Sequence, residues 1–192
     1  MQSDEAAREY AKEYLQVTKE SLSGGYIEQG LAELVPLFRK AREEGRTIYF
    51  FGNGGSASTG SHMATDISKC TIKEPLRRYR CVSLADPIPT MLAWANDVSY
   101  AEIFSEQLKN MGDKGDVAVG ISGSGNSPNV IRALETARKM GMSTVGLIGS
   151  GGGKMRPHCD VAIVVPSHDM QHIEDTHLLI GHLLTAYLRD RA

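Results

Sequence analysis

The chain has 192 residues and a formal net charge of -2 at pH 7. This length is enough for one domain with a full hydrophobic core, and the near-neutral charge excludes the overall basic surface of a typical nucleic-acid-binding protein. Three cysteines without paired spacing indicate free thiols in a reducing compartment, and no run approaches the ~20 apolar residues of a membrane span. Residues 1–5 lack the basic and apolar regions of a signal peptide, so we expect a cytoplasmic protein that binds neither nucleic acid nor membranes.

Two helices are predicted before the first strand. Ser3 is expected to be the N-cap of a helix that ends near Ser21. A second helix is predicted over residues 26–44, because its apolar residues recur at helical spacing, and Gly45 is expected to close it. Residues 1–45 thus form a helical pair that either mediates self-association or packs against the rest of the domain.

From residue 46 onward, strands and helices alternate. Strands are predicted at residues 47–51, 81–84, 117–121, 144–148 and 161–165, and helices at residues 56–69, 89–95, 100–111, 127–140 and 171–189. Apolar strands that alternate with helices favour a doubly wound α/β fold, with a five-stranded parallel sheet and ligands bound at the carboxyl ends of its strands. We therefore predict a single domain over residues 1–192, with its α/β core at 46–192.

A glycine-rich turn, Gly52-Asn53-Gly54-Gly55-Ser56, follows the first predicted strand. A strand, such a turn and a helix N-terminus make an anion site, and we expect the N–H groups of the first helical turn to point at the ligand. The spacing of Gly52, Gly54 and Ala57 also fits the loose dinucleotide fingerprint. However, no acidic residue ends a strand about twenty residues later, where a ribose would need one. Both a phosphosugar site and a nucleotide site remain open at this point.

A serine-rich turn after the third predicted strand favours the phosphosugar site. Residues 122–127 read Ser-Gly-Ser-Gly-Asn-Ser, and Ser127 is a natural N-cap with Pro128 in the first helical position. The hydroxyls of Ser122, Ser124 and Ser127 can hold a phosphate together with backbone N–H groups. The alternative is a tight turn that hydrogen-bonds to itself. No Gly-x4-Gly-Lys-Ser/Thr motif of nucleoside triphosphatases is present.

Two helices offer histidines and carboxylates at suggestive spacings. His62 and Asp66 are four residues apart and share one helix face. Glu174 and His182 are eight apart, which separates their directions by about 80°. Two imidazoles and two carboxylates can bind zinc or act as an acid–base pair. Asp175 is an alternative to Glu174, and helix histidines are more often surface or core residues than ligands.

Three motifs together resemble the sugar isomerase (SIS) domain family, and within it the phosphoheptose isomerases: Gly-Asn-Gly-Gly-Ser at 52–56, Asn96-Asp97, and Ser-Gly-Ser-Gly-Asn-Ser at 122–127. Members of this branch interconvert sedoheptulose 7-phosphate and a heptose 7-phosphate. The resemblance covers nearly the whole chain. It implies a flavodoxin-like five-stranded sheet and a homotetramer whose active sites are shared between subunits.

The resemblance also implies the roles of individual residues. It places one Zn²⁺ ion on His62, Asp66, Glu174 and His182, and proton transfer on Asp66 and His182. Together with Ser56 of the first loop, the expected substrate-binding residues are Asn53, Gly54, Gly55, Asp66, Asn96, Asp97, Ser122, Gly123, Ser124, Ser127 and Glu174.

Two positions depart from the family pattern. Asp66 stands where the family usually has glutamate, and Glu174 where it usually has glutamine. Asp66 is one methylene shorter, and a base misplaced by about 1 Å can lose a hundredfold in rate. Glu174 loses the donor of an amide but adds a negative charge that should strengthen metal binding. These changes bear on the identity of the substrate more than on the fold.

The expected activity is aldose–ketose isomerisation of sedoheptulose 7-phosphate to D-glycero-D-manno-heptose 7-phosphate, by proton transfer through an enediol intermediate. Asp66 and His182 would share the proton transfer, with Glu174 as an alternative base. Two alternatives stay open. One is a non-catalytic SIS module that binds a protein partner such as a replication initiator, and the other is an isomerase of a different sugar phosphate.

Overall fold

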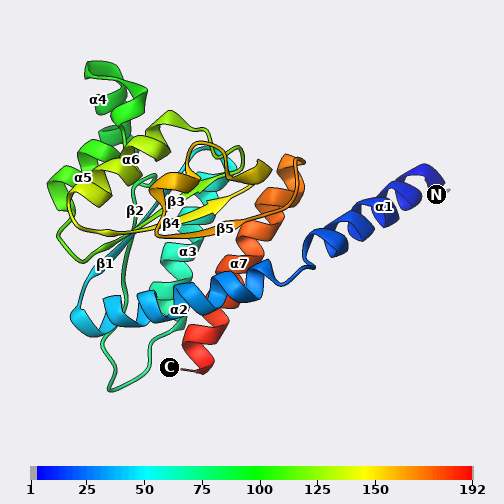
Figure 1. Cartoon of the computed structure of the whole chain (residues 1–192), viewed down its shortest axis with the longest axis horizontal. Coiled ribbons are helices and arrows are strands. Elements are labelled where there is room, and N and C mark those ends of the chain that lie inside the picture. The colour runs from blue at the N-terminus through cyan, green and yellow to red at the C-terminus, as the bar shows by residue number, and fades with distance from the viewer. Residues whose placement is uncertain (1–3, 192) are drawn as a thin grey trace.

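The structure is a computed structural model, and it describes residues 4–191. Five parallel strands form one sheet, as predicted, and their order is β2-β1-β3-β4-β5 (Figure 1). The order is that of flavodoxin-like folds. The strands are β1 (Thr47–Gly52), β2 (Arg80–Ser83), β3 (Val117–Ser122), β4 (Ser143–Ile148) and β5 (Val161–Val164).

Helices cover both faces of this sheet, with α2, α3 and α7 on one side and α5 and α6 on the other (Figure 1). Their bounds are α2 (Tyr26–Glu44), α3 (Gly55–Cys70), α5 (Ser105–Met111), α6 (Pro128–Lys139) and α7 (Met170–Asp190). Successive strand residues point to opposite faces, so Phe50 packs in the core beneath the first set and Phe51 in the core beneath the second. No helix between residues 4 and 191 combines the length and the apolar character needed to cross a membrane.

The helix predicted over residues 100–111 is wrong in one respect, because the structure divides it in two. A short 3₁₀ helix, η1 (Tyr100–Glu102), is followed by a turn at Ile103 and Phe104, and α5 begins only at Ser105. Ile103 and Phe104 are 2% and 1% exposed, and both belong to the core on the α5–α6 side of the sheet. Adjacent side chains of one helix point about 100° apart. The turn instead allows both apolar side chains to be buried in the same core.

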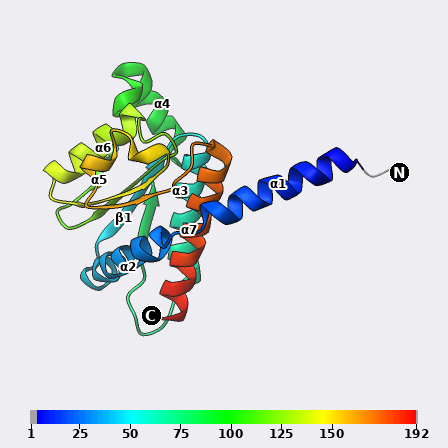
Figure 2. The same ribbon diagram turned by 45° about the vertical axis from the view of Figure 1, so that its right-hand side comes forward.

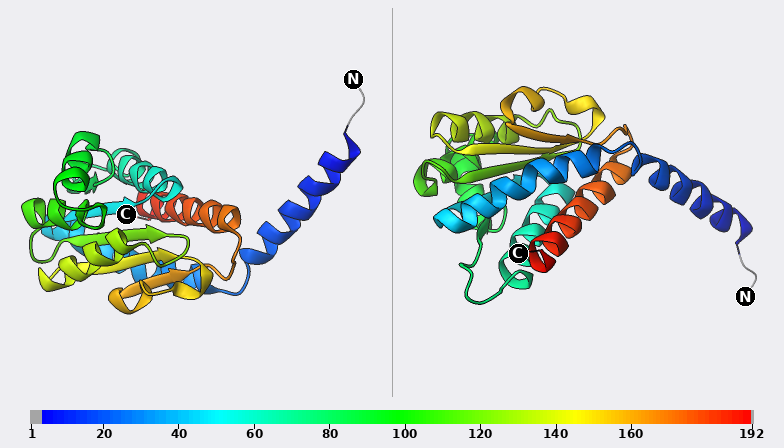
Figure 3. Two further views of the ribbon diagram at one scale, coloured as in Figure 1. Left: turned by 90° about the horizontal axis from the view of Figure 1, so that it is seen from above. Right: turned by 60° about the horizontal axis from the view of Figure 1, so that its bottom comes forward.

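The two N-terminal helices differ in their environment. Helix α2 packs against β1, β5 and α7, whereas α1 (Glu5–Ser21) projects from the body as an arm (Figures 1 and 2). The views in Figure 3 show the same separation. In α1 only Tyr14, Thr18 and Ser21 are not exposed. Asp4 is the N-cap, accepting hydrogen bonds from Ala6 and Ala7, while Ser3 lies outside the described residues.

Strands β1 and β3 are neighbours in the sheet, with Gly52 opposite Ile121. The glycine-rich and serine-rich turns follow these two strands directly, so the two turns lie side by side at the carboxyl edge of the sheet. The strand order reverses at this point, which is where open α/β sheets bind their ligands. The fold thus brings together the two motifs that the sequence analysis singled out.

Candidate active site

The serine-rich turn surrounds a small pocket of about 160 Å³. The hydroxyl oxygens of Ser122 and Ser127 lie 3.1 Å apart, and Ser122 also accepts the N–H of Gly125 at 3.1 Å. Of the two hydroxyl hydrogens, only one can lie between the two serine oxygens, so the other is available to an anionic ligand. The pocket is lined by Asn53, Ser56, Ile121, Ser122, Gly123, Ser124, Ser127, Met170 and Glu174.

The serine-rich turn is held from behind by the glycine-rich segment that follows β4. The N–H of Met155 donates to the carbonyl of Gly125 at 2.9 Å, and the N–H of Lys154 donates to the Asn126 side chain at 3.1 Å. Gly125 has φ +64°, and a Cβ there would collide with the carbonyl of Gly152. Only glycine fits this close approach, so the segment supports the pocket wall.

The glycine-rich turn closes on itself more than expected. The N–H of Ser56 donates to the carbonyl of Asn53, and the N–H groups of Ala57 and Ser58 both donate to the carbonyl of Gly54. The expectation that the N–H groups of this first helical turn point at a ligand is therefore wrong for these three residues. The side chains of Asn53 and Ser56 line the pocket instead.

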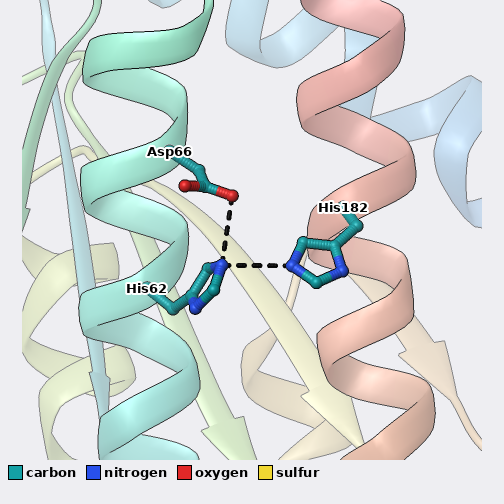
Figure 4. Close-up of side chains that lie close together, drawn as sticks. All are labelled: His62, Asp66 and His182. Carbon is teal, nitrogen blue, oxygen red and sulfur yellow. Dashed lines mark hydrogen bonds and ion pairs between the residues drawn. The ribbon is translucent and has the colours of Figure 1, made fainter.

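His62, Asp66 and His182 converge from α3 and α7 (Figure 4). The Nε2 atom of His62 lies 3.1 Å from Asp66 Oδ2 and 3.1 Å from His182 Nε2. Four donors at about 2.0–2.1 Å from a tetrahedral zinc ion lie about 3.4 Å from one another. Two imidazole nitrogens and one carboxylate oxygen at these separations fit a divalent metal ion, with a position left for a further ligand.

Glu174 does not belong to this group. Its carboxylate lies beside the first residue of α3, where a Cβ on Gly55 would collide with it, and it lines the serine pocket. The structure thus joins three of the four expected metal ligands and places the fourth at the phosphate-type pocket. Asp175, the alternative to Glu174, accepts a hydrogen bond from Tyr14 in the arm at 2.8 Å.

Known proteins resemble this chain in sequence and in fold. The profile of the SIS domain family matches residues 9–149. A phosphoheptose isomerase from Helicobacter pylori (strain P12) is 39% identical over 176 residues, which are 90% of each chain. The chain belongs to the SIS domain family, among the phosphoheptose isomerases. A phosphoheptose isomerase from Paramagnetospirillum magneticum is 40% identical over 85% of each chain.

Solved SIS structures show the same architecture. The phosphoheptose isomerase GmhA from Neisseria gonorrhoeae superposes with a TM-score of 0.85 and 28% identity, covering 96% of this chain and 97% of that one. A phosphoheptose isomerase from Francisella tularensis gives a TM-score of 0.85 and 25% identity over the full length of both chains. The fold and the family resemblance are therefore confirmed, and a dinucleotide site is set aside.

Two residues of the SIS motif lie apart from the pocket. Asn96 and Asp97 end helix α4 (Ile88–Asp97), are exposed, and bond to each other at 2.8 Å between Asn96 Nδ2 and Asp97 Oδ1. Neither lines the serine pocket or the apolar hollow of about 190 Å³ beneath α4. A role for this pair in binding sugar hydroxyls stays a prediction.

Other histidines of α7 have separate environments. His172 lies 2.9 Å from the Thr18 hydroxyl through its Nδ1 atom and stacks on Tyr14 of the arm. His177 is 0% exposed, and this burial lowers its pKa to about 4, against an opposing effect of the Ile148 backbone. Neither histidine contributes to the group of three ligands at His62.

Asn129 and Tyr100, whose side chains contact Asn53, were not predicted from the sequence. Asn129 follows Pro128 at the start of α6, where asparagine side chains commonly accept hydrogen bonds from nearby backbone N–H groups. Tyr100 is one of several tyrosines in an exposed segment. No spacing in the sequence connects either residue with Asn53, since Asn129 approaches it through the pairing of β1 with β3 and Tyr100 approaches it from η1.

Proposed function

We propose that this protein is an aldose–ketose isomerase that converts sedoheptulose 7-phosphate to D-glycero-D-manno-heptose 7-phosphate by proton transfer through an enediol intermediate. The observation that carries the proposal is that the two helices that bring Ser56 and Glu174 to the serine pocket, α3 and α7, also carry the His62–Asp66–His182 group, in a chain of the phosphoheptose isomerase family. The serine pocket suits a phosphate, and the histidine–carboxylate group suits proton transfer at the opposite end of an open-chain sugar.

The serine pocket would hold the phosphate. Ser122 is 3% exposed, so its hydroxyl is held in place, and Ser124 and Ser127 add further hydroxyls from the same turn. Hydrogen bonds from fixed donors to a phosphate oxygen are charge-assisted and therefore stronger than neutral ones. Binding energy gathered there would align carbons 1 and 2 of the sugar with the proton-transfer groups.

Asp66 and His182 would move the proton between these two carbons. The carboxylate would take a proton from carbon 1 of the ketose and return it to carbon 2, while the imidazole would take the proton of the carbon-1 hydroxyl and give one to the carbonyl oxygen on carbon 2. Asp66 is partly buried and His182 is exposed, so neither side chain is enclosed in the core. Glu174 remains an alternative base, because its carboxylate faces the pocket that would hold the substrate.

His62, Asp66 and His182 would hold a zinc ion, with Glu174 as a fourth ligand after a shift of its side chain. The donor set suits zinc, which prefers nitrogen and oxygen ligands of this kind. When bound, such an ion supplies Lewis-acid stabilisation of negative charge on the substrate oxygens. His62 would then orient Asp66, its neighbour at 3.1 Å, toward the reacting carbons.

Two rival functions follow from the same fold. A non-catalytic SIS module that binds a protein partner would not need an acid and a base, yet the chain has both Asp66 and His182 beside His62. An isomerase of a different sugar phosphate would use the same groups. Asp66 and Glu174 depart from the family pattern. If the protein does not convert sedoheptulose 7-phosphate, these two residues favour an isomerase of a different sugar phosphate.

We further propose a cytoplasmic homotetramer with active sites at subunit interfaces. The arm α1 projects from the body and exposes the apolar side chains of Tyr10, Leu15 and Val17, at 69%, 67% and 47%. A shallow hollow on α7 places His182 beside Leu179 and Leu183, so apolar surface surrounds one proton-transfer group. A second subunit covering this surface would exclude water from the site.

The experiment is an isomerase assay on sedoheptulose 7-phosphate with protein as purified, after chelator treatment, and after zinc is restored. Metal-dependent turnover would support the reaction and the metal group together. Turnover absent from every preparation that still binds metal would point to another sugar phosphate. No turnover and no bound metal, together with a stable initiator complex, would favour the binding module.

A further inference from the structure

Asn53 and Asn129 join the two ligand-binding turns through a reciprocal pair of amide hydrogen bonds. Asn53 Nδ2 donates to Asn129 Oδ1 at 2.9 Å, and Asn129 Nδ2 donates to Asn53 Oδ1 at 2.8 Å. Asn53 belongs to the glycine-rich turn after β1, and Asn129 is the second residue of α6, which follows the serine-rich turn. The pair therefore fixes the distance between the two walls of the pocket.

A backbone group decides how both amides are oriented. The N–H of Val130 donates to Asn129 Oδ1 at 3.0 Å, and an N–H cannot donate to an NH₂ group. Asn129 must therefore keep its oxygen toward Val130 and its nitrogen toward Asn53. Asn53 in turn must present its oxygen to that nitrogen, so neither side chain can exchange its oxygen and nitrogen without losing bonds.

Tyr100 completes the network from η1. Its hydroxyl donates to Asn53 Oδ1 at 2.9 Å, so this oxygen accepts two hydrogen bonds and its two lone pairs are both used. Of the two N–H groups on Asn53 Nδ2, one is used by Asn129. Asn53 thus retains a single N–H donor and no acceptor for a ligand in the pocket that it lines.

We propose that Asn129 is a positioning residue, which acts through Asn53 and makes this side chain a pure hydrogen-bond donor in the ligand pocket. Asn129 is 1% exposed and does not line the pocket, so it does not touch the ligand itself. The ligand atom that meets Asn53 is an acceptor, namely a phosphate, carbonyl or hydroxyl oxygen. This inference rests on the proposed function, because the ligand is the phosphosugar of that site.

A purely local role for Asn129 would be to bind the N–H of Val130 at the start of α6. That role concerns the helix and not Asn53. The two possibilities therefore differ in whether the effect of removing Asn129 on activity depends on the presence of Asn53. If Asn129 acts through Asn53, its removal matters for activity only while Asn53 is present. If Asn129 only stabilises α6, its removal has the same effect whether or not Asn53 is present.

The test is a double-mutant cycle with Asn53→Ala, Asn129→Ala and the double variant, each measured for kcat/KM on sedoheptulose 7-phosphate and for thermal stability. Loss of one oriented hydrogen bond lowers a rate or affinity about tenfold. We expect Asn129→Ala to lower kcat/KM about tenfold in the wild-type background and less than about twofold in the Asn53→Ala background. Its effect on thermal stability should be smaller in the Asn53→Ala background but still present, because the bond from the Val130 N–H is lost in both. If the fold loss of kcat/KM in the double variant equals the product of the losses in the two single variants, the inference is overturned.

Two controls separate this outcome from other failures. Asn110→Ala, an exposed asparagine on α5, should leave kcat/KM unchanged. If wild-type protein does not turn over, the proposed function fails, and the side-chain amide resonances of Asn53 in ¹⁵N-labelled protein decide the inference instead. We expect these hydrogens to exchange slowly in the wild type and quickly in Asn129→Ala. Equal exchange in both proteins would overturn the role of Asn129.

Discussion

The Nε2 atoms of His62 and His182 lie 3.1 Å apart, although 120 residues separate the two side chains in the chain. Two neutral imidazoles at this distance share one hydrogen, and Asp66 Oδ2 approaches the same His62 nitrogen at 3.1 Å. One N–H of His62 cannot satisfy both neighbours well. A divalent cation held by the three atoms would remove this competition.

The purified protein should carry one divalent ion per subunit. His62→Ala removes a donor that faces both other ligands, so its bound metal, measured by elemental analysis after dialysis, should fall at least about tenfold. His168→Ala, an exposed histidine outside the group, is the matched control and should keep the wild-type content. Unchanged metal in His62→Ala would show that the ion binds elsewhere.

Asp66→Asn should lower kcat by about a hundredfold or more, because general-base catalysis contributes a factor of that order. Asp66→Glu should retain far more activity than Asp66→Asn, since it keeps a carboxylate and adds the methylene that the family usually has. Thr65→Ala, at an exposed neighbouring position of α3, should behave as wild type in the same steady-state assay. Equal activity of Asp66→Asn and wild type would remove Asp66 from the mechanism.

Ser127→Ala should raise KM for the phosphosugar about tenfold or more, with a smaller effect on kcat, because a hydrogen bond to a charged group contributes about 1.5–3 kcal/mol. Stability should change little, since the Ser127 side chain makes no capping bond to α6. Ser23→Ala, at an exposed serine between α1 and α2, provides the control. A pure fall in kcat at constant KM would argue against phosphate binding at this turn.

Acid should destabilise the protein through His177. Its folded pKa of about 4 lies below the unfolded value of about 6.5, so the unfolded chain takes up a proton that the folded chain refuses between these values. The resulting stability loss begins as the pH falls below about 6.5 and reaches roughly 2 kcal/mol at pH 5.

Urea unfolding at pH 7.5 and pH 5, at one protein concentration, measures this loss. His177→Leu keeps an apolar side chain in the buried site and has no proton to gain, so its stability should depend less on pH over this range. The reference is His168→Leu, at an exposed position, which should keep the wild-type pH dependence. An unchanged pH dependence in His177→Leu would assign the acid sensitivity to other groups.

The arm α1 should carry a subunit contact. Leu15→Glu places a charge on its exposed apolar surface and should lower the molar mass measured by light scattering at micromolar concentration. Gln16→Glu adds the same charge at the next, exposed polar position and should leave the mass unchanged. Wild-type and Leu15→Glu proteins of the same mass would place the interface elsewhere.

Much of the fold was predictable because each element has its own local signal. Helix α2 begins at Tyr26 and ends at Glu44 as predicted, and Gly45 closes it with φ +69°. The parallel sheet follows from apolar strands that alternate with helices, whereas its flavodoxin-like order was implied only by the family resemblance. The break at Ile103 and Phe104 was not predictable, because both residues fit a helical pattern and only the shape of the core separates them.

The two turns of the candidate site could be located from the sequence, but most contacts between its side chains could not. The spacing of His62 and Asp66 predicts a shared helix face, and the structure agrees. The spacing of Glu174 and His182 allows convergence but does not fix it, and Glu174 turns toward Gly55 instead. The Asn53–Asn129 pair has no sequence signal, because it depends on how two distant turns approach each other.

The pairing of β1 with β3 also has a consequence for folding kinetics. Ile48 lies opposite Val117, 69 residues further along the chain, and this pairing is what brings the two ligand-binding turns together. Contacts between such distant residues form slowly, because the entropy of closing a long loop opposes them. A chain delayed before this step has neither pocket wall in place. Misfolding variants should therefore show a smaller fraction of active molecules, while the molecules that complete the sheet keep normal substrate affinity.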